Sequence, residues 1–436
     1  MSNIYQTSKL GRSADTGDLL AQRKRNTLTR VIASQKSAGT YKPNLSSRSF
    51  EAITLRSTNG LDSLLIPKNR STPILIYSPT FKTTFGNTGR ANLAVYANGT
   101  WIVVGREAPP TPSERHVLFG ADPGSLISFS PGLFGAGGEG HSVIYANNTW
   151  VISGMNSNGG VVYYGSNLGT LGTLPVLFSN SGSMANSASF GNGTWVICGE
   201  DSSPSGNNVW YGSNLTGLTA LQLFGAGGAA NSAVYANNTW VICGQTVSTG
   251  NNVWYGPNLT SLTGLSLFGT GGATNAVYAN NTWVIYGFDS SPSGNNVYYG
   301  PNLASLTPLP LFGAGGAVQS VAYADNTWVF CGISGGGIHV YYGSNLTIPL
   351  SPLSLFGSGS MGTYVIYANG KWVICGEDGT GSGNCVFYGS NLASLTPLQV
   401  FGNGGTATSA TYANNTLVIC GRDNTAAARN VYYGAF

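Results

Sequence analysis

The stretch Ser232-Ala-Val-Tyr-Ala-Asn-Asn-Thr-Trp-Val-Ile-Cys-Gly244 decides the fold of this chain. Two apolar runs, 232–236 and 239–244, are separated by only two residues, Asn237 and Asn238. A two-residue hairpin turn needs positive φ at both central positions, which Asn and Gly tolerate best. The stretch therefore predicts two antiparallel strands joined by a tight turn.

The same hairpin recurs along most of the chain. Its aromatic anchor falls at Trp101, Trp150, Trp195, Trp240, Trp283, Trp328 and Trp372, with Leu417 in the eighth place, at spacings of 49, 45, 45, 43, 45, 44 and 45 residues. A third strand such as 252–256 and a fourth such as 265–269 follow each hairpin. A period of 40–50 residues built only from strands is typical of a β-propeller with one four-stranded blade per repeat.

The two ends of the repeat region predict how the ring closes. The last repeat stops after its third strand, 430–434, and the first begins with an orphan fourth strand, 81–86. Pairing the two completes an eighth blade and removes exposed strand edges. We therefore expect an all-β, eight-bladed β-propeller over 81–436, closed by an N-terminal strand. Residues 50–80 are expected to be a linker or a partial extra β-element, and a ninth partial blade remains an alternative.

Charge is scarce and unevenly distributed. Charged residues make up 8% of the chain, against about 25% in an ordinary soluble domain. Residues 1–90 hold 14 Lys/Arg and 4 Asp/Glu, whereas 91–436 hold 5 and 11. A weakly charged ring fits a protein packed among others better than a solvated enzyme. Residues 1–49 are expected to form a basic, extended N-terminal arm.

The arm is the first candidate contact surface. Its expected partner-binding residues are Lys9, Arg12, Arg23, Lys24, Arg25, Arg30 and Lys36. Binding of single-stranded nucleic acid usually combines such cations with aromatic side chains, and the arm has only Tyr5 and Tyr41. We therefore favour other structural proteins as partners over nucleic acid.

The repeat resembles a known propeller family. Its cycle of Y-x-N-G-x-W, V-x-x-G and Y-Y-G-S-N-L is similar to the Asp-box, or bacterial-neuraminidase, repeat of sialidase-like propellers. Here Asn replaces the Asp of the box in six repeats (Asn167, Asn214, Asn258, Asn302, Asn345 and Asn391), and 121–124 is the nearest to a true box. The Asn-rich, charge-poor composition of the repeats also resembles that of propeller structural proteins of large double-stranded DNA viruses. These resemblances imply the fold and not an activity.

The sequence contains little that indicates catalytic activity. The charged neighbourhood worth probing is the seam between the first and last repeats, with the candidate residues Arg106, Arg115, Arg422 and Arg429. The three histidines lack metal-ligand spacing, and no phosphate-binding loop or nucleophile motif occurs. Five of six cysteines share one repeat position that elsewhere holds Val, Ser or Tyr, which indicates packing. We expect no catalytic residue, cofactor or metal.

The sequence thus predicts a non-enzymatic structural or assembly protein, a minor capsid or surface component of a large virus particle, assembled in the host cytoplasm and docked through its arm. The alternative is a lectin-like or receptor-binding propeller, in which Trp210 and Trp254 line sugar pockets. Aromatic residues at the matching positions, assigned as Tyr164, Tyr298, Tyr342 and Phe387, favour a core aromatic layer instead. No run of about 20 apolar residues is present to span a bilayer.

Overall fold

The computed structural model describes residues 50–57, 60–67, 80–82, 84–86, 89–107, 115–129, 132–180, 182–247, 250–289, 291–425, 427 and 429–436. The arm, 1–49, and the strand-like run 73–78 lie outside the described residues. Contacts divide the chain into two units, 1–75 and 76–436. In the first unit, β1 (Phe50–Ser57) and β2 (Gly60–Pro67) form a two-stranded antiparallel sheet.

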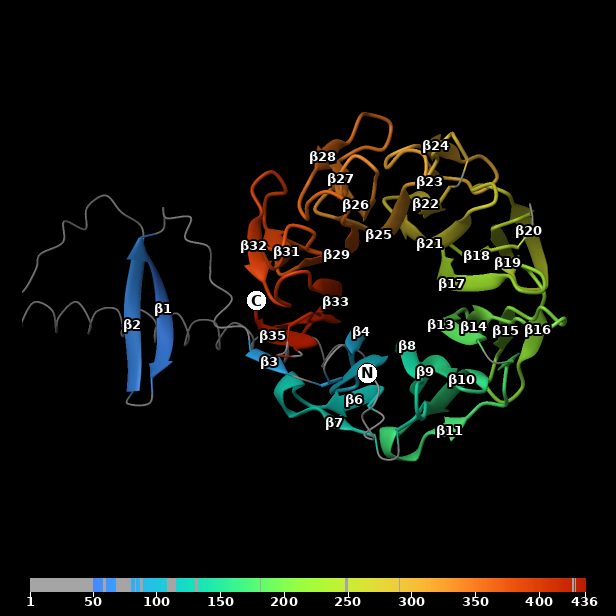
Figure 1. Ribbon diagram of the computed structural model, residues 1–436, viewed down its shortest axis with the longest axis horizontal. Coiled ribbons are helices and arrows are strands. Elements are labelled where there is room, and N and C mark those ends of the chain that lie inside the picture. Colours follow the sequence, from blue (N-terminus) through green and yellow to red (C-terminus); the bar gives the residue numbers. More distant parts are fainter. Residues whose placement is uncertain are drawn as a thin grey trace, which may run out of the picture. The chain divides into compact units, whose positions relative to one another are not determined.

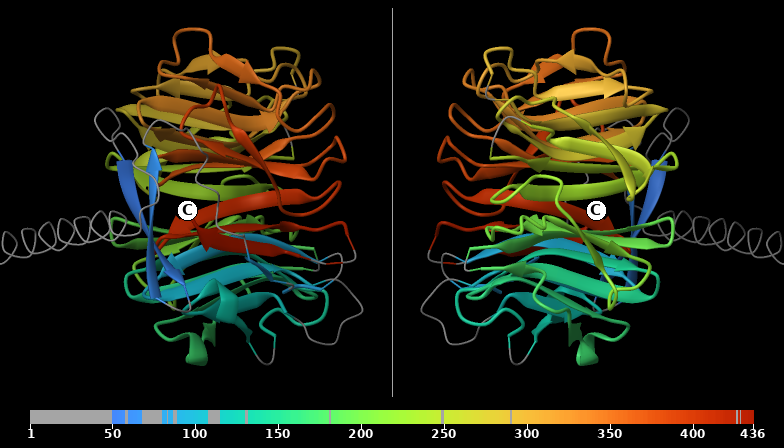
Figure 2. Two further views of the ribbon diagram at one scale, coloured as in Figure 1. Left: turned by 90° about the vertical axis from the view of Figure 1, so that its left-hand side faces the viewer. Right: turned by 90° about the vertical axis from the view of Figure 1, so that its right-hand side faces the viewer.

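The second unit is a β-propeller, as expected, with antiparallel repeats of four main strands arranged around a central axis (Figure 1). Single residue pairs, such as Glu200 with Ala229, join several of these repeats into one larger sheet. Its strands run roughly along that axis (Figure 2). The innermost strands are β4 (Arg90–Ala97), β8 (Glu139–Ala146), β13 (Met184–Gly191), β17 (Ala229–Ala236), β21 (Gly272–Ala279), β25 (Ala317–Ala324), β29 (Gly362–Ala368) and β33 (Thr406–Ala413). The second strands are β5 (Thr100–Arg106), β9 (Thr149–Asn156), β14 (Thr194–Glu200), β18 (Thr239–Gln245), β22 (Thr282–Phe288), β26 (Thr327–Ile333), β30 (Lys371–Gly376) and β34 (Thr416–Arg422).

The outer half of each sheet is shorter. The third strands are β6 (Val117–Gly120), β10 (Gly159–Gly165), β15 (Val209–Gly212), β19 (Val253–Asn258), β23 (Val297–Gly300), β27 (Val340–Gly343), β31 (Asn384–Gly389) and β35 (Val431–Ala435). The outermost are β7 (Ile127–Ser128), β11 (Gly172–Thr173), β16 (Thr219–Leu221), β20 (Ser261–Leu265), β24 (Thr307–Leu309), β28 (Ser351–Leu353), β32 (Thr396–Gln399) and β3 (Thr80–Lys82). A two-residue strand, β12 (Phe178–Ser179), also pairs with β10, and the short 3-10 helices η1 (Pro123–Ser125) and η2 (Leu168–Thr170) follow β6 and β10.

The hairpin turns have the backbone geometry that the sequence predicts. Asn237 and Asn238 have φ of 46° and 55°, and Asp325 and Asn326, the one departure in sequence, have 46° and 54°. Across the β17–β18 hairpin, Tyr235 lies opposite Trp240 with ring centroids 5.1 Å apart. The repeated tryptophan is 1–2% exposed at all seven positions, and Leu417, in the eighth, is 2% exposed. The anchors are therefore core residues.

In several repeats, a buried polar side chain at the start of the third strand holds the crossing to the next sheet. The Asn208 carboxamide accepts from Phe224 N at 2.9 Å and donates to Gly228 O at 2.7 Å. Asn296 bonds Phe312 N and Gly316 O in the same way. These side chains satisfy backbone groups that the Gly-rich crossings would otherwise bury unpaired.

The two ends of the repeat region meet through the same contacts. β3 pairs with β35, with Phe81 opposite Tyr432. Asn430 accepts from Phe85 N at 3.0 Å and donates to Gly89 O at 2.8 Å, repeating the bonds of Asn208 across 345 residues of chain. Further in, Thr408 donates to Ala91 O at 2.6 Å. β33 and β34 therefore pack on β4 with the bonding used between consecutive sheets.

Candidate functional site

The meeting of first and last repeats places the four predicted arginines on one edge of two neighbouring sheets. Arg106 ends β5 and Arg422 ends β34, and both are exposed. Arg115 and Arg429 come just before the antiparallel partners β6 and β35. Because the end of a second strand lies beside the start of the third, all four belong to the same edge of the seam.

The four arginines have different surroundings. The Arg429 guanidinium carbon lies 3.7 Å from the centre of the Phe81 ring, a cation–π contact that fixes it over β3. Arg115 is exposed and lines a cleft of about 300 Å³ together with Lys82, from β3. The seam thus contains one arginine held within the fold and one that faces an open space.

A second charged cluster, which the sequence did not single out, lies where β4 meets β8. The Arg90 guanidinium forms an ion pair of 2.5 Å with Glu139, which also accepts from Asn92 at 2.7 Å. Burial raises the pKa of Glu139, but the bonds from Asn92 and Arg90 outweigh it and lower the pKa. Burial lowers the pKa of the neighbouring His141. This cluster joins two innermost strands, and Oε1 of its carboxylate accepts from both Arg90 and Asn92.

Acidic side chains recur in the loops that leave the second strands. Asp201 Oδ1 accepts from Ser203 N at 3.0 Å, and its Oδ2 accepts from Ser205 Oγ at 2.7 Å and Asn207 N at 3.1 Å. Burial raises the pKa of Asp201, and these hydrogen bonds more than compensate, so that the pKa is lowered. The equivalent acids are Glu107, Asp289, Asp378 and Asp423. These carboxylates fold their own loops, and aligning the repeats would have revealed them.

The cysteines are packing residues. All six are free and buried. Burial raises the pKa of the Cys198 thiol to about 12, which leaves almost no thiolate at neutral pH. No group of three or more His, Cys, Asp or Glu that could hold a metal ion occurs within the described part of the chain. Among the same residues, no helix has the length and apolarity to cross a membrane.

The predicted arm residues lie outside the described part of the chain, and the predicted aromatic layer is shifted by one residue in two repeats. The arm residues Lys9, Arg12, Arg23, Lys24, Arg25, Arg30 and Lys36 lie outside the described residues. For the aromatic layer, the strand register corrects the alignment by one residue: Tyr163 and Tyr341, not Tyr164 and Tyr342, occupy the position of Trp254. The Trp254 indole donates to Leu223 O at 3.0 Å, so its polar edge is engaged within the fold.

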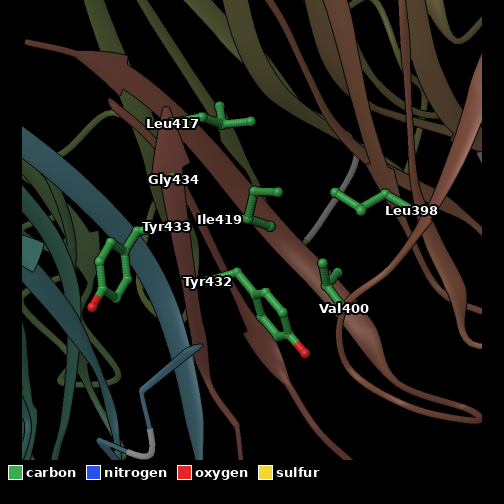
Figure 3. Close-up of a pocket in the computed structure, with 7 residues that line it drawn as sticks. All are labelled: Leu398, Val400, Leu417, Ile419, Tyr432, Tyr433 and Gly434. Carbon is green, nitrogen blue, oxygen red and sulfur yellow. The ribbon is translucent and has the colours of Figure 1, made fainter. Parts of the chain in front are cut away.

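A small apolar pocket beside β35 offers no room for a ligand. Leu398 and Val400 line one side, and residues of β34 and β35, including Ile419 and Tyr432, line the other (Figure 3). Its volume is about 10 Å³, roughly the minimum for one water molecule. It is a packing gap between neighbouring sheets.

Comparisons with known proteins agree on the fold. No protein-family model matches the chain, and no curated protein sequence matches it significantly. The structure is similar to the computationally designed Ika8 protein, with 14% identity, 81% of this chain and 98% of that chain covered, and a TM-score of 0.53. It also matches the WD40 β-propeller domain of Doa1 (14% identity, 69% and 94% covered, TM-score 0.44) and virginiamycin B lyase from Staphylococcus aureus (8%, 68% and 94%, 0.48). The arrangement of antiparallel strands around one axis (Figure 1) shows that the chain is an all-β protein with a β-propeller fold.

Proposed function

We propose that this chain is a non-enzymatic structural protein, a minor capsid or surface component of a large virus particle, with a rigid eight-bladed propeller as its body. The observation that carries the proposal is that many of the repeated polar side chains are engaged within the fold. The Asp201-type carboxylates fold their loops, the Asn208-type carboxamides hold the crossings, and the cysteines are buried. Such a body is suited to presenting surfaces rather than to moving protons.

Two local features support the finer description of the fold. The pairing of β3 with β35 and the Asn430 bonds support an eight-bladed ring closed by the N-terminal strand. In the Asp-box-like turns, Asn167 Oδ1 accepts from Gly169 N at 2.8 Å, and Asp122 Oδ1 accepts from Gly124 N at 2.6 Å. Asn and Asp thus fill the same turn role, which supports the sialidase-like repeat as a structural device.

The arm supplies the proposed docking contact, and its removal tests it. Particles of the source virus, stripped of this chain, would be incubated with the full chain and with a chain lacking 1–49. We expect only the full chain to reattach, and nuclease treatment to leave reattachment unchanged because the partner is protein. Changing the seven predicted partner-binding cations of the arm to Gln gives the matched variant. This variant should dissociate from the particles at a lower salt concentration than the full chain. Absence of this chain from intact particles would contradict the proposal.

Glycan recognition is the alternative function. A glycan array probed with the full chain distinguishes the two, since saturable binding to one class of sugar is expected only of a lectin-like propeller. The test of the structural proposal does not depend on that result, because it measures reattachment to particles.

A further inference from the structure

The repeat provides its own internal control for finding a site. Where seven copies carry one kind of residue and the eighth carries another, the eighth departs from what packing alone prefers. Two such departures, Lys82 and Thr84, line the 300 Å³ cleft beside β3, together with Arg115, Leu118, Leu126, Ile127 and Ser128. The cleft lies at the seam, between the closing strand and the β6–β7 hairpin.

Lys82 replaces a leucine. In the register it lies opposite Val431, and the residues in the same place in five other sheets are Leu221, Leu265, Leu309, Leu353 and Leu398. The half-buried Lys82 ammonium donates to Leu126 O at 2.8 Å and Gly124 O at 3.2 Å. An ammonium has three N–H donors, so these two bonds leave one for a ligand.

Thr84 replaces an apolar residue. The residue before the crossing phenylalanine is Leu133, Leu177, Leu223, Leu267, Leu311, Leu355 or Val400 in the other repeats. Thr84 is 2% exposed, and its hydroxyl has no hydrogen-bond partner. Burying an unpaired hydroxyl costs roughly 1–3 kcal/mol relative to a bonded one, so packing does not account for this threonine.

The hydrogen-bond donors around the cleft suit an anion. Arg115 contributes an exposed guanidinium, and Lys82 contributes an ammonium. Two carboxylates lie nearby, and both are already bonded to backbone: Asp122 Oδ1 accepts from Gly124 N at 2.6 Å, and Glu107 Oε2 accepts from Arg115 N at 2.6 Å. The cations thus retain donors for a further negative group.

The rest of the lining is apolar. Leu118 and Leu126 are buried in the wall, whereas Ile127 is 59% exposed. A volume of about 300 Å³ is at the small end of ligand pockets and fits one carboxylate with a short aliphatic neighbour. An acidic residue beside an apolar one, in an extended peptide segment, has this chemistry.

We infer that the seam cleft binds a carboxylate carried by an extended, partly apolar segment of a partner protein, through Arg115, Lys82 and Thr84. The carboxylate would accept hydrogen bonds from the guanidinium and the ammonium, and its neighbouring aliphatic side chain would pack on Ile127. This contact is separate from the arm, so it holds or fails independently of arm docking.

Binding of short peptides to the full chain tests the inference. Acetyl-Ala-Leu-Glu-Leu-Ala-amide carries only a side-chain carboxylate, acetyl-Ala-Leu-Gln-Leu-Ala with a free terminus carries only a terminal one, and the amidated Gln peptide carries neither. We expect saturable binding, measured by NMR shifts of the labelled protein, for one or both acidic peptides and not for the neutral one. Equal binding of the neutral peptide, or no saturable binding of any, would overturn the inference.

Two single substitutions distinguish binding in the cleft from general electrostatic attraction. Arg115→Gln should weaken the acidic peptide by about tenfold or more, the loss expected for a hydrogen bond to a charged group. Arg422→Gln removes the same charge from the same edge, outside the cleft lining, and should change affinity less than about twofold at physiological salt. Equal effects of the two would show attraction without a site and contradict the inference.

A double variant that introduces the apolar residues of the other repeats controls for loss of binding through misfolding. Lys82→Leu with Thr84→Leu introduces the residues that the other sheets use, so we expect the ring to melt at the same or a higher temperature while peptide binding is lost. Unchanged binding in this variant would overturn the assignment of both residues. A clear fall in melting temperature would show that they serve packing instead.

Discussion

The acidic loop residues show how single side chains set the shape of this protein. Asp289 repeats the bonds of Asp201: Oδ1 accepts from Ser291 N at 2.8 Å, and Oδ2 accepts from Ser293 Oγ at 2.8 Å and Asn295 N at 2.9 Å. One carboxylate thus bonds to three other residues of its loop. Its energetic role depends on the negative charge, because both oxygens act as acceptors.

This charge dependence gives a prediction about acid stability. Burial raises the pKa of Asp289, but the serine and backbone bonds outweigh it, so the folded-state pKa lies below the ordinary 3.8. The stabilisation is therefore complete above about pH 4 and is lost as the pH falls through the folded-state pKa. In Asp289→Asn, the amide NH₂ cannot accept two of the bonds. We expect a lower melting temperature at pH 7 and a smaller difference between pH 7 and pH 3, measured by circular dichroism. An unchanged pH profile would contradict this role.

The cysteines give a second prediction at this scale. Burial raises the pKa of Cys198 and Cys420 to about 12, and all six thiols are enclosed. We expect the native protein to react with fewer than one equivalent of a thiol reagent at pH 8, and with six equivalents once unfolded in guanidinium. Rapid labelling of a native thiol would show that its sheet opens.

At the scale of elements, the crossing between sheets is the repeated unit of stability. Each crossing buries one phenylalanine, and Phe85, which follows the closing strand, is 0% exposed like Phe268 in a covalently continuous crossing. Phe85 packs with Val418, Cys420 and Val431 of the last repeat. The chain is discontinuous between β35 and β3, and the crossing that follows β3 nevertheless has the same core as a crossing in an uninterrupted repeat.

A matched pair of substitutions tests this equivalence. Phe85→Ala and Phe268→Ala each remove one buried ring and should each lower the free energy of unfolding by about 3–5 kcal/mol, as measured by urea denaturation. Similar losses at the two sites would support closure through β3. A loss below about 1 kcal/mol for Phe85→Ala alone would contradict it.

The same elements show what the sequence could and could not predict. Asn-Asn and Asn-Gly turns, apolar strand pairs and the orphan strand near Phe81 were sufficient to predict hairpins, propeller and strand pairing, because each is a local pattern repeated many times. The Arg90–Glu139 pair and the Lys82 bonds join residues from different repeats. No local sequence pattern therefore predicts them. The departure of Lys82 became visible only after the strand register fixed the alignment, whereas that of Thr84, directly before a Phe-Gly pair, is visible in the sequence alone.

At the scale of the whole molecule, side chains on several innermost strands bond to the backbone of the next innermost strand along the chain. Asn186 donates to Ala230 O, Asn231 donates to Ala273 O, both at 2.9 Å, and Thr363 donates to Ala407 O. Thr408 continues the series across the seam. The propeller is thus held by contacts that do not depend on where the chain is continuous.

Truncation tests the arrangement as a whole. Because β3 begins at Thr80, a chain of 76–436 should keep the melting temperature of the full protein's main transition. A chain of 89–436 lacks the closing strand and Phe85, and should melt lower and elute earlier in size-exclusion chromatography, through opening or association of its free edge. Identical behaviour of the two truncations would show that β3 is dispensable.

The bonds of Asn430 also suggest that the chain could be circularly permuted. Since β3 pairs with β35 as a fourth strand pairs with a third strand in the other repeats, β35 and β3 could be joined by a short linker and the chain cut at the equivalent turn of another repeat, for example between Ala304 and Ser305. A circular permutant made in this way should regain the same architecture, with its start and finish moved to a different sector of the ring. Such a result would show that the architecture does not depend on which pair of outer strands is left without a covalent connection.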